Sequence, residues 1–402
     1  MIAVTISTLS FQMNAVDQMD ALQQAMSKTQ SELSTGLQLQ SAADNPVGMA
    51  QVDQLNMQLS ASQQYVTNGN LANANLQLEE QALTDATNGI QSVRDLAVQA
   101  NNASLNASQR QDIATQLVQL EQQLVSIANR QDAQGNYLFS GFASGTQPFS
   151  QNGNSVAYSG AEQVSQVQIS SDQRISAGDT GSAVFMNIPG GNGTFTTAAA
   201  AANSGTASIG PGTVTDPSQW VPDTYTISFT SGTQYQVTNS SGTVVSSGSI
   251  TSTPGSTATI SFNGVQVTLS GAPNAGDQFT VAPAGTASVF ATISGLISTL
   301  NSTSLNSAQI ATQLNQGIEQ LDGAVNNINQ VQASVGARIN AITAAQSTAQ
   351  SEQTNYQTSI SQIADTNYAA ATTQLSTEEL ALQAAQESYG SIQKLSLFNY
   401  VQ

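Results

Sequence analysis

The sequence predicts a mainly α-helical fold with a β-rich insert. We expect an elongated rod of long coiled-coil helices made from both ends of the chain, with a small β domain protruding from its middle. Two observations predict the rod: apolar residues repeat at steps of three and four near the N-terminus, and again near the C-terminus. A third predicts the insert: between these segments the composition shifts to Thr, Ser, Gly and Val, with apolar residues at alternate positions.

The first predicted helix carries a diluted coiled-coil seam. Gln residues interrupt it, so this helix needs a partner for stability. Gly36 offers a C-cap at its end. The apolar a and d positions are Leu9, Val16, Met19, Met26, Leu33 and Leu37.

Two more helices are expected before the insert. The breaker Asp44-Asn45-Pro46 supplies a cap and a proline for a first helical turn. From there a heptad frame runs to about Asn101, and about 55 helical residues would measure about 80 Å. After a turn, a clean apolar stripe predicts a third helix to about Arg130.

The helical pattern ends at Gly135-Asn136. Short β pieces are expected from there to Ile188, and a low-complexity loop over Pro189–Ala202. A β domain then runs from about Thr206 to near Pro283. Within it, Asn263-Gly264 between two alternating segments predicts a two-residue hairpin.

Helix is expected again from about Ser288 nearly to the end of the chain. Its last part has a seam with residues spaced by seven: Tyr368, Leu375, Leu382 and Tyr389. These patterns predict a terminal helical assembly domain (1–40 and 362–402), a helical rod domain with short β pieces (41–188 and 286–361) and a β-rich insert (189–285).

Composition restricts the possible functions. Only 8% of the 402 residues are charged, and the net charge is -18. An acidic chain is a poor partner for nucleic acid or for an anionic membrane. The weakly charged, amide-rich surface favours association with other subunits over simple solvation. The N-terminus lacks the basic region of a cleavable signal peptide, since the first basic residue is Lys28, and no apolar run is long enough to span a bilayer.

The sequence offers no catalytic, cofactor or metal site. It has no His and no Cys, which excludes imidazole bases, thiolate nucleophiles and most zinc sites. The pairs Glu79-Glu80 and Glu378-Glu379 point about 100° apart on a helix, so solvated or salt-bridged side chains are expected. The scattered Asp residues of the middle region lack EF-hand spacing, which leaves only a surface cation as an alternative. We therefore do not expect an enzyme.

Two pairs of residues leave alternatives open. Trp220 and Tyr225 could form a carbohydrate-binding surface, although core packing is favoured. Arg94 and Arg338 could pair with carboxylates inside the rod or across a subunit boundary.

At both ends the chain resembles the flagellin superfamily of bacterial axial proteins. Within it, the chain resembles the hook–filament junction proteins, the third hook-associated proteins. Two stretches favour that group over filament flagellins: Gly135 to Phe142 and Leu395 to Tyr400. The superfamily motifs are Ser34-Thr35-Gly36, Ser41 to Gly48, Gln64-Tyr65 with Asn68, Val93 to Asn101, Arg110 and Val335-Gly336-Ala337-Arg338.

The resemblance implies an extracellular structural subunit of the bacterial flagellum. It implies export by the flagellar type III apparatus, a cytoplasmic chaperone at the C-terminal helices, and terminal helices that are disordered in the monomer. The implied neighbours are the first hook-associated protein on the hook side, flagellin on the filament side, and further copies in a ring. The expected assembly interface comprises the two seams with Leu395, Leu397 and Phe398, and the expected rod contacts are Arg94, Asp95, Arg110 and Arg338.

Three other functions remain open on the residues alone. The nearest is a filament flagellin, against which the C-terminal Phe398-Asn399-Tyr400 argues. A different class is a stalked adhesin that binds glycans through the β domain. A hydrolase is disfavoured by the missing His and Cys.

Overall fold

The computed structural model describes residues 2–102, 104–153, 155–251 and 257–398, and the side chains among them except those of 2–9, 392 and 394–398. The chain divides into two compact units, Met1–Thr67 with Ala345–Gln402, and Asn68–Ala344. The boundary falls inside two long helices. The division into three domains made from the sequence stays a prediction.

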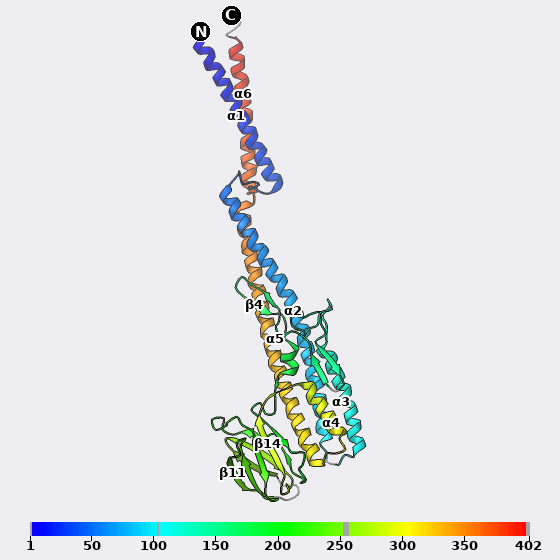
Figure 1. The fold of residues 1–402 in the computed structure, drawn as a ribbon. Coiled ribbons are helices and arrows are strands. Elements are labelled where there is room, and N and C mark those ends of the chain that lie inside the picture. Colours follow the sequence, from blue (N-terminus) through cyan, green and yellow to red (C-terminus); the bar gives the residue numbers. More distant parts are fainter. Residues whose placement is uncertain (1, 103, 154, 252–256, 399–402) are drawn as a thin grey trace. The chain divides into compact units, whose positions relative to one another are not determined.

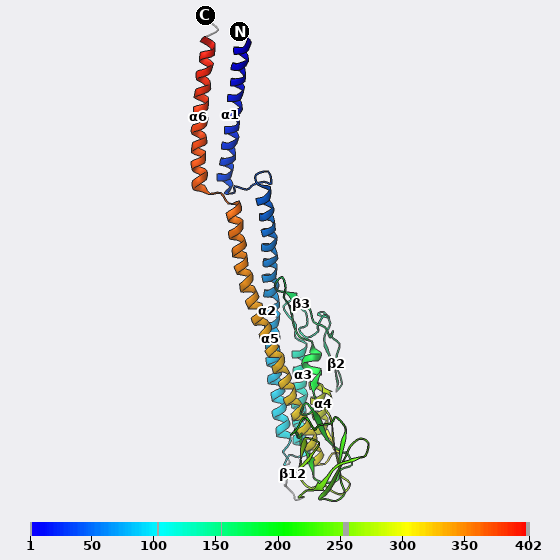
Figure 2. The same cartoon turned by 90° about the vertical axis from the view of Figure 1, so that its left-hand side faces the viewer.

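The first unit pairs the two ends of the chain. Helix α1 (Ile2–Thr35) and helix α6 (Tyr368–Phe398) lie side by side in Figures 1 and 2. Helix α1 ends at Thr35, and the next residue, Gly36, takes a φ of 76° and donates its N–H to the Glu32 carbonyl at 2.9 Å. The unit also holds the start of α2 (Pro46–Ala100) and the end of α5 (Ser307–Ala364).

Helix α2 begins where the breaker predicts. Pro46 occupies its first position, and the Asn45 side chain accepts the Gly48 N–H at 2.9 Å. Asn45 is therefore the cap. Asp44 instead accepts the N–H groups of Gln40 and Ser41.

The second unit contains a helical core. The rest of α2 and α5 packs there with α3 (Ala107–Ala128) and α4 (Val289–Asn301), which Ser288 caps. Figure 2 shows α3 and α4 beside the two long helices. The sequence did not predict the turn at 302–306 that separates α4 from α5. Fully buried side chains from all four helices form this core: Leu76, Leu83, Ile90, Leu117, Leu124, Ile293, Leu314, Leu321, Ile328, Val335 and Ile342.

Short β pieces cover the helices of this unit. They are the hairpin of β1 (Phe149–Asn152) and β2 (Ser155–Tyr158), the pair β3 (Gln166–Gln168) and β4 (Arg174–Ser176), and the pair β5 (Ile188–Pro189) and β15 (Thr286–Ala287), with a π-helix η1 (Ser182–Met186) between β4 and β5. Phe149, Phe185 and Phe290 meet with ring centroids 5.3–5.9 Å apart. This aromatic cluster packs β1 and η1 against α4.

The β domain consists of two antiparallel sheets around their own core. One sheet has the order β11-β10-β9-β14-β6, and the other has the path β12-β13-β7, with β8 also paired to β13. The strands are β6 (Phe195–Ala199), β7 (Ser208–Ile209), β8 (Thr213–Val214), β9 (Tyr225–Phe229), β10 (Gln234–Thr238), β11 (Val244–Ser249), β12 (Thr257–Phe262), β13 (Val265–Ser270) and β14 (Gln278–Pro283).

Two predictions for this domain had different outcomes. The Asn263-Gly264 hairpin is confirmed, with φ of 44° and 73° at its two turn residues and Phe262 paired to Val265. The loop predicted over Pro189–Ala202 is wrong in part, because Phe195–Ala199 forms an edge strand. Phe195 and Thr197 are buried there while Thr196 and Ala198 are less so, an alternation that the Thr and Ala run conceals.

The predicted fold class, mainly α with a β insert, is confirmed. No helix in the described ranges is long and apolar enough to cross a membrane.

Candidate assembly interface

The seams predicted for the two ends of the chain face each other only in part. Met19, Met26 and Leu33 on α1 are half-buried. So are Leu375, Leu382 and Tyr389 on α6. Two helices can bury only one stripe of each other, so these side chains keep part of their surface in water.

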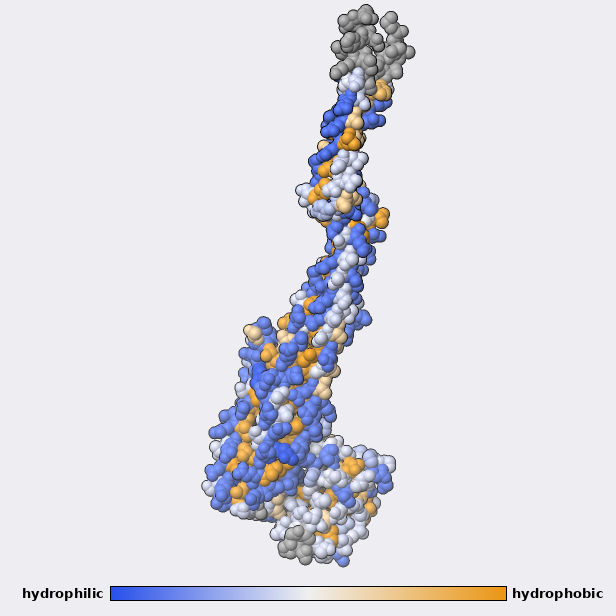
Figure 3. Space-filling view, turned by 180° about the vertical axis from the view of Figure 1, so that it is seen from behind, coloured by the Kyte–Doolittle hydropathy of each residue, from blue (hydrophilic) through white to orange (hydrophobic). Residues whose placement is uncertain are grey.

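Other apolar side chains of this unit are exposed outright. Val16, Leu37 and Tyr368 are 39%, 40% and 56% exposed. Sequence reasoning missed Phe11, Met13 and Leu380, at 56%, 63% and 68%, because they lie off the heptad frame. Figure 3 shows apolar patches among hydrophilic ones along the described part of this pair. Leu9, Leu395, Leu397 and Phe398 lie outside the residues whose side chains are described.

A buried carboxylate on α6 also lacks a full set of partners. Glu378 is 9% exposed, and one of its oxygens accepts the Gln374 amide at 2.9 Å. Its Oε2 has no hydrogen-bond partner among the described atoms. The expectation that Glu378 is solvated or salt-bridged is therefore wrong. Packing of α6 against α1 covers the side chain without supplying a cation.

The breaks in the two terminal segments are joined to each other. The Ala364 carbonyl accepts the Gln38 N–H at 2.8 Å, and the Gly36 carbonyl accepts the Thr366 N–H at 2.8 Å. Leu39, Val52 and Ala364 form a small apolar cluster beside this joint. Because both hydrogen bonds cross between the two ends of the chain, and the cluster holds residues from both, the N- and C-terminal segments order this joint together.

One exposed ion pair flanks the joint. Lys28 Nζ lies 2.8 Å from Asp44 Oδ1. The hydrogen bonds from Lys28 and Ser41 lower the pKa of Asp44 to about 2. The pair links α1 to the segment that leads into α2.

The basic residues singled out in the second unit make contacts within the chain. Arg94 Nε lies 2.5 Å from Asp322 Oδ1, on α5. Arg110 donates to the Leu105 carbonyl at 3.1 Å and holds the turn before α3. Asp95, beside Arg94, is exposed. Arg94 and Arg338 both pair with carboxylates of their own chain here.

Arg338 sits in a largely buried cluster with two carboxylates. It forms an ion pair with Asp179 and donates to the Gly178 carbonyl at 3.1 Å. Glu79 is 2% exposed and accepts the Asp179 N–H at 3.0 Å. Burial, and then the nearby Asp179 charge, raise the pKa of Glu79 well above its ordinary value, although Arg338 opposes the shift. The expectation of a solvated or salt-bridged Glu79 is thus wrong, because the side chain is buried and the ion pair of Arg338 is with Asp179.

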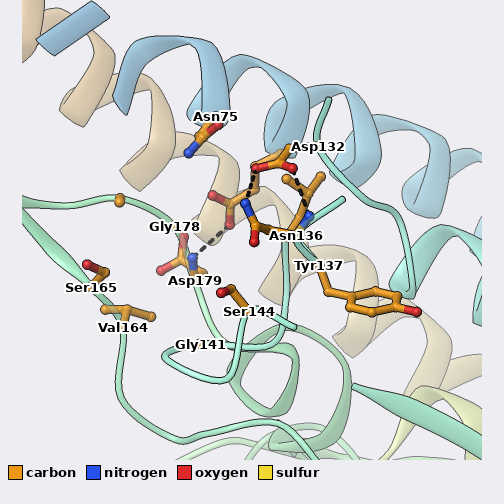
Figure 4. A pocket seen from close by; sticks show the side chains of 13 residues that line it. Asn75, Asp132, Asn136, Tyr137, Gly141, Ser144, Val164, Ser165, Gly178 and Asp179 are labelled. Carbon is orange, nitrogen blue, oxygen red and sulfur yellow. Dashed lines mark hydrogen bonds between the residues drawn. The ribbon is translucent and has the colours of Figure 1, made fainter. Parts of the chain in front are cut away.

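Glu79 and Asp179 line a polar cavity of about 160 Å³. Figure 4 shows Asp132 and Asn136 hydrogen-bonded on one side of it and the N–H of Asp179 bonded on the other. Asn136 donates its side chain to Asp132 at 3.1 Å. In the described part of the chain, no group of three or more His, Cys, Asp or Glu side chains is placed to hold a metal ion.

The two candidate carbohydrate-binding residues belong to the β-domain core. Tyr225 is 2% exposed and donates its hydroxyl to the Val221 carbonyl at 2.8 Å. Trp220 packs between Phe195 and Tyr225, with ring centroids at 5.6 and 5.7 Å. These contacts agree with the core-packing interpretation.

Three protein-family models match the chain. The bacterial flagellin N-terminal helical region matches residues 6–144, and the bacterial flagellin C-terminal helical region matches residues 318–401. Between them, the D2-like domain of flagellar hook-associated protein 1 matches residues 198–283. The insert thus has a family match of its own, over the β domain.

Flagellar hook-associated protein 3 of Escherichia coli is 31% identical over 157 residues, 39% of this chain and 49% of that protein. Flagellin B of Vibrio cholerae is 30% identical over 139 residues, 35% of this chain and 37% of that protein. The chain thus spans about half the length, or less, of these curated relatives.

Solved structures extend the similarity. FlgL of Xanthomonas campestris is 33% identical with a TM-score of 0.69, over 76% of this chain and 99% of that one. Flagellar hook-associated protein 3 of Legionella pneumophila is 31% identical with a TM-score of 0.72, over 78% of this chain and 98% of that one.

Proposed function

Because the chain belongs to the flagellin superfamily, in its group of FlgL-type hook-associated proteins, we propose that it is a structural junction subunit of the bacterial flagellum. It connects the hook, through another hook-associated protein, to the flagellin filament and nucleates that filament. Its action is geometric and non-enzymatic. The observation that carries this function is the paired α1 and α6, whose apolar side chains remain half-buried or exposed after they have packed on each other.

Assembly completes the burial that one chain leaves unfinished. Copies of the chain arranged in a ring, with the first hook-associated protein and flagellin as neighbours, cover the exposed side chains of α1 and α6. Each fully buried Leu, Met or Phe side chain contributes about 1.5–3 kcal/mol. Before assembly the terminal helices are disordered, and a cytoplasmic chaperone holds the C-terminal helices until export to the cell exterior.

One experiment tests both the proposed junction function and the filament-subunit alternative. The gene is deleted in its own bacterium, the cells are imaged by electron microscopy, and flagellin is assayed in the medium. We expect bare hooks with unpolymerised flagellin outside the cells. Bare hooks with no external flagellin would instead identify the chain as the filament protein, and intact filaments in a strain without a second copy of the gene would contradict both functions.

A further inference from the structure

The β domain is connected to the helices of its unit by two glycine-flanked segments. Strands β5 and β15 pair with each other, and the Gly190 N–H donates to the Gly285 carbonyl at 2.7 Å. Glycines also occupy positions 191 and 193. Apart from these two segments the β domain has its own closed core, with Phe195, Ile227 and Val281 among its buried residues. It is thus a body that can turn about the paired connection.

Three amide side chains at the start of α5 hold this body against the helix. Asn306 donates to the Asn203 carbonyl at 3.3 Å, and Gln309 to the Ala201 carbonyl at 2.9 Å. Gln316 donates to the Thr197 carbonyl of the edge strand β6. Figure 1 shows the β domain beside this end of α5. Neutral hydrogen bonds of this kind are individually weak, so a small change at the contact can move the equilibrium.

A cavity of about 290 Å³ lies between the connecting loop and α5. Glu319, half-buried, and Asp322 line its helical wall. Asp322 itself pairs with Arg94. The loop wall, residues 189–193, has no ionisable side chain. Burial, and then the Asp322 charge, raise the pKa of Glu319 to about 7.

We propose that Glu319 is a pH-sensitive lock on the position of the β domain. Protonated Glu319 is neutral and leaves the amide contacts of α5 intact. Ionised Glu319 draws water into the cavity between α5 and the connecting loop, which releases the domain to turn about the paired strands β5 and β15.

The direction of the pH effect follows from the linkage between protonation of Glu319 and docking of the β domain. A carboxyl whose pKa is higher in the docked than in the released state favours docking at low pH, and this preference is lost as the pH rises through the docked value. If release returned Glu319 to its ordinary pKa of 4.5, docking would weaken about tenfold between pH 6 and pH 8. Because the Glu319 side chain is half-exposed, solvent screening reduces this weakening of docking. We expect the docking equilibrium to change by about two- to tenfold between pH 6 and pH 8.

The absence of native Cys permits a direct measurement. Two exposed positions, Ser247 on β11 and Ala333 on α5, are changed to Cys in the full chain and spin-labelled. Electron–electron distance distributions are recorded from pH 5.5 to pH 8.5. We expect one short, narrow distance at low pH and a growing second population above neutral pH.

Three variants separate the lock from general pH effects. Glu319→Gln should keep the narrow distribution throughout. Glu352→Gln, which removes an exposed carboxylate from the same helix, should behave as the parent. Gln316→Leu, which removes an amide contact, should show the released population already at pH 6. A parent distribution that does not change with pH, a pH dependence that survives Glu319→Gln, or a Gln316→Leu distribution equal to the parent's would overturn the proposal.

Discussion

At the scale of single residues, Glu79, Asp179 and Arg338 bring two carboxyl groups and one guanidinium together in the second unit. Glu79 is 2% exposed, and its burial raises its pKa well above the ordinary value although the Arg338 guanidinium opposes the shift. In the sequence Glu79 stands beside Glu80, which is exposed. The sequence could not show that the segment before η1 covers Glu79. That segment lies 100 residues further along the chain. Burial by such distant contacts has no local signature.

Glu79→Gln should make the second unit more stable at pH 8 and leave it nearly unchanged at pH 5. Because the folded pKa of Glu79 is raised, its contribution to stability is present below its ordinary pKa of 4.5 and is lost as the pH rises through the folded value. The gain should therefore be larger at pH 8 than at pH 5. Urea unfolding at both pH values measures it. Glu80→Gln, on an exposed neighbour, is the control, and an equal gain there would contradict the explanation.

Arg338→Met should make the second unit less stable. It leaves the buried Glu79 and the partly exposed Asp179 without their cation, which costs up to about 3–5 kcal/mol. The loss should be larger at pH 8 than at pH 5, because protonation of Glu79 relieves it. Arg94→Met is the matched comparison: its pair with Asp322 is 38% and 48% exposed, so its removal should cost no more than about 1 kcal/mol. Equal losses in the two variants would show that burial does not decide the strength of these pairs.

At the scale of elements, the local sequence predicted the helices better than the breaks between them. The heptad seams predicted α1, α2 and the helical character of α6, and the Asn-Gly turn predicted a hairpin. The break at 365–367 between α5 and α6 was not predicted, because helix was expected to continue through it. The turn at 302–306 was missed, although its residues repeat an earlier pattern: Ser104-Leu105-Asn106 precedes α3, and Ser304-Leu305-Asn306 precedes α5. Each Asn exchanges hydrogen bonds with a Gln three residues on, at 2.9 and 3.0 Å in both cases. The repeated motif was the signal that could have found this helix start.

Asn106→Ala should destabilise the second unit by about 1 kcal/mol, because it removes the acceptor for the Gln109 N–H. Asn106→Asp keeps that acceptor and should retain most of the stability. Thermal unfolding followed by circular dichroism compares the two variants with the parent. If Asp were as harmful as Ala, the capping box would not be the source of the stability of this helix start.

At the scale of the whole molecule, the sequence predicted association with other subunits but not which surface would take part. The half-buried side chains of α1 and α6 follow the predicted seams, whereas Phe11, Met13 and Leu380 are exposed outside them. A heptad frame finds the stripe that one partner helix buries. It does not find the faces that further subunits would cover, because those positions have no fixed spacing relative to the first stripe. The buried Oε2 of Glu378, which has no hydrogen-bond partner among the described atoms, depends on how α6 packs against α1, so the sequence of α6 alone does not reveal it.

The assembly role of the seam is tested by Met26→Asp with Leu33→Asp. Both side chains are half-buried on α1, and two charges there oppose any packing that completes their burial. We expect the double variant to be secreted but to leave the cells without filaments and non-motile in soft agar. Gln116→Asp with Gln123→Asp adds the same charges, seven residues apart, on exposed positions of α3, and should support motility. Normal motility of the seam variant would show that this stripe only joins α1 to α6, and the assembly surface would then lie on the exposed side chains.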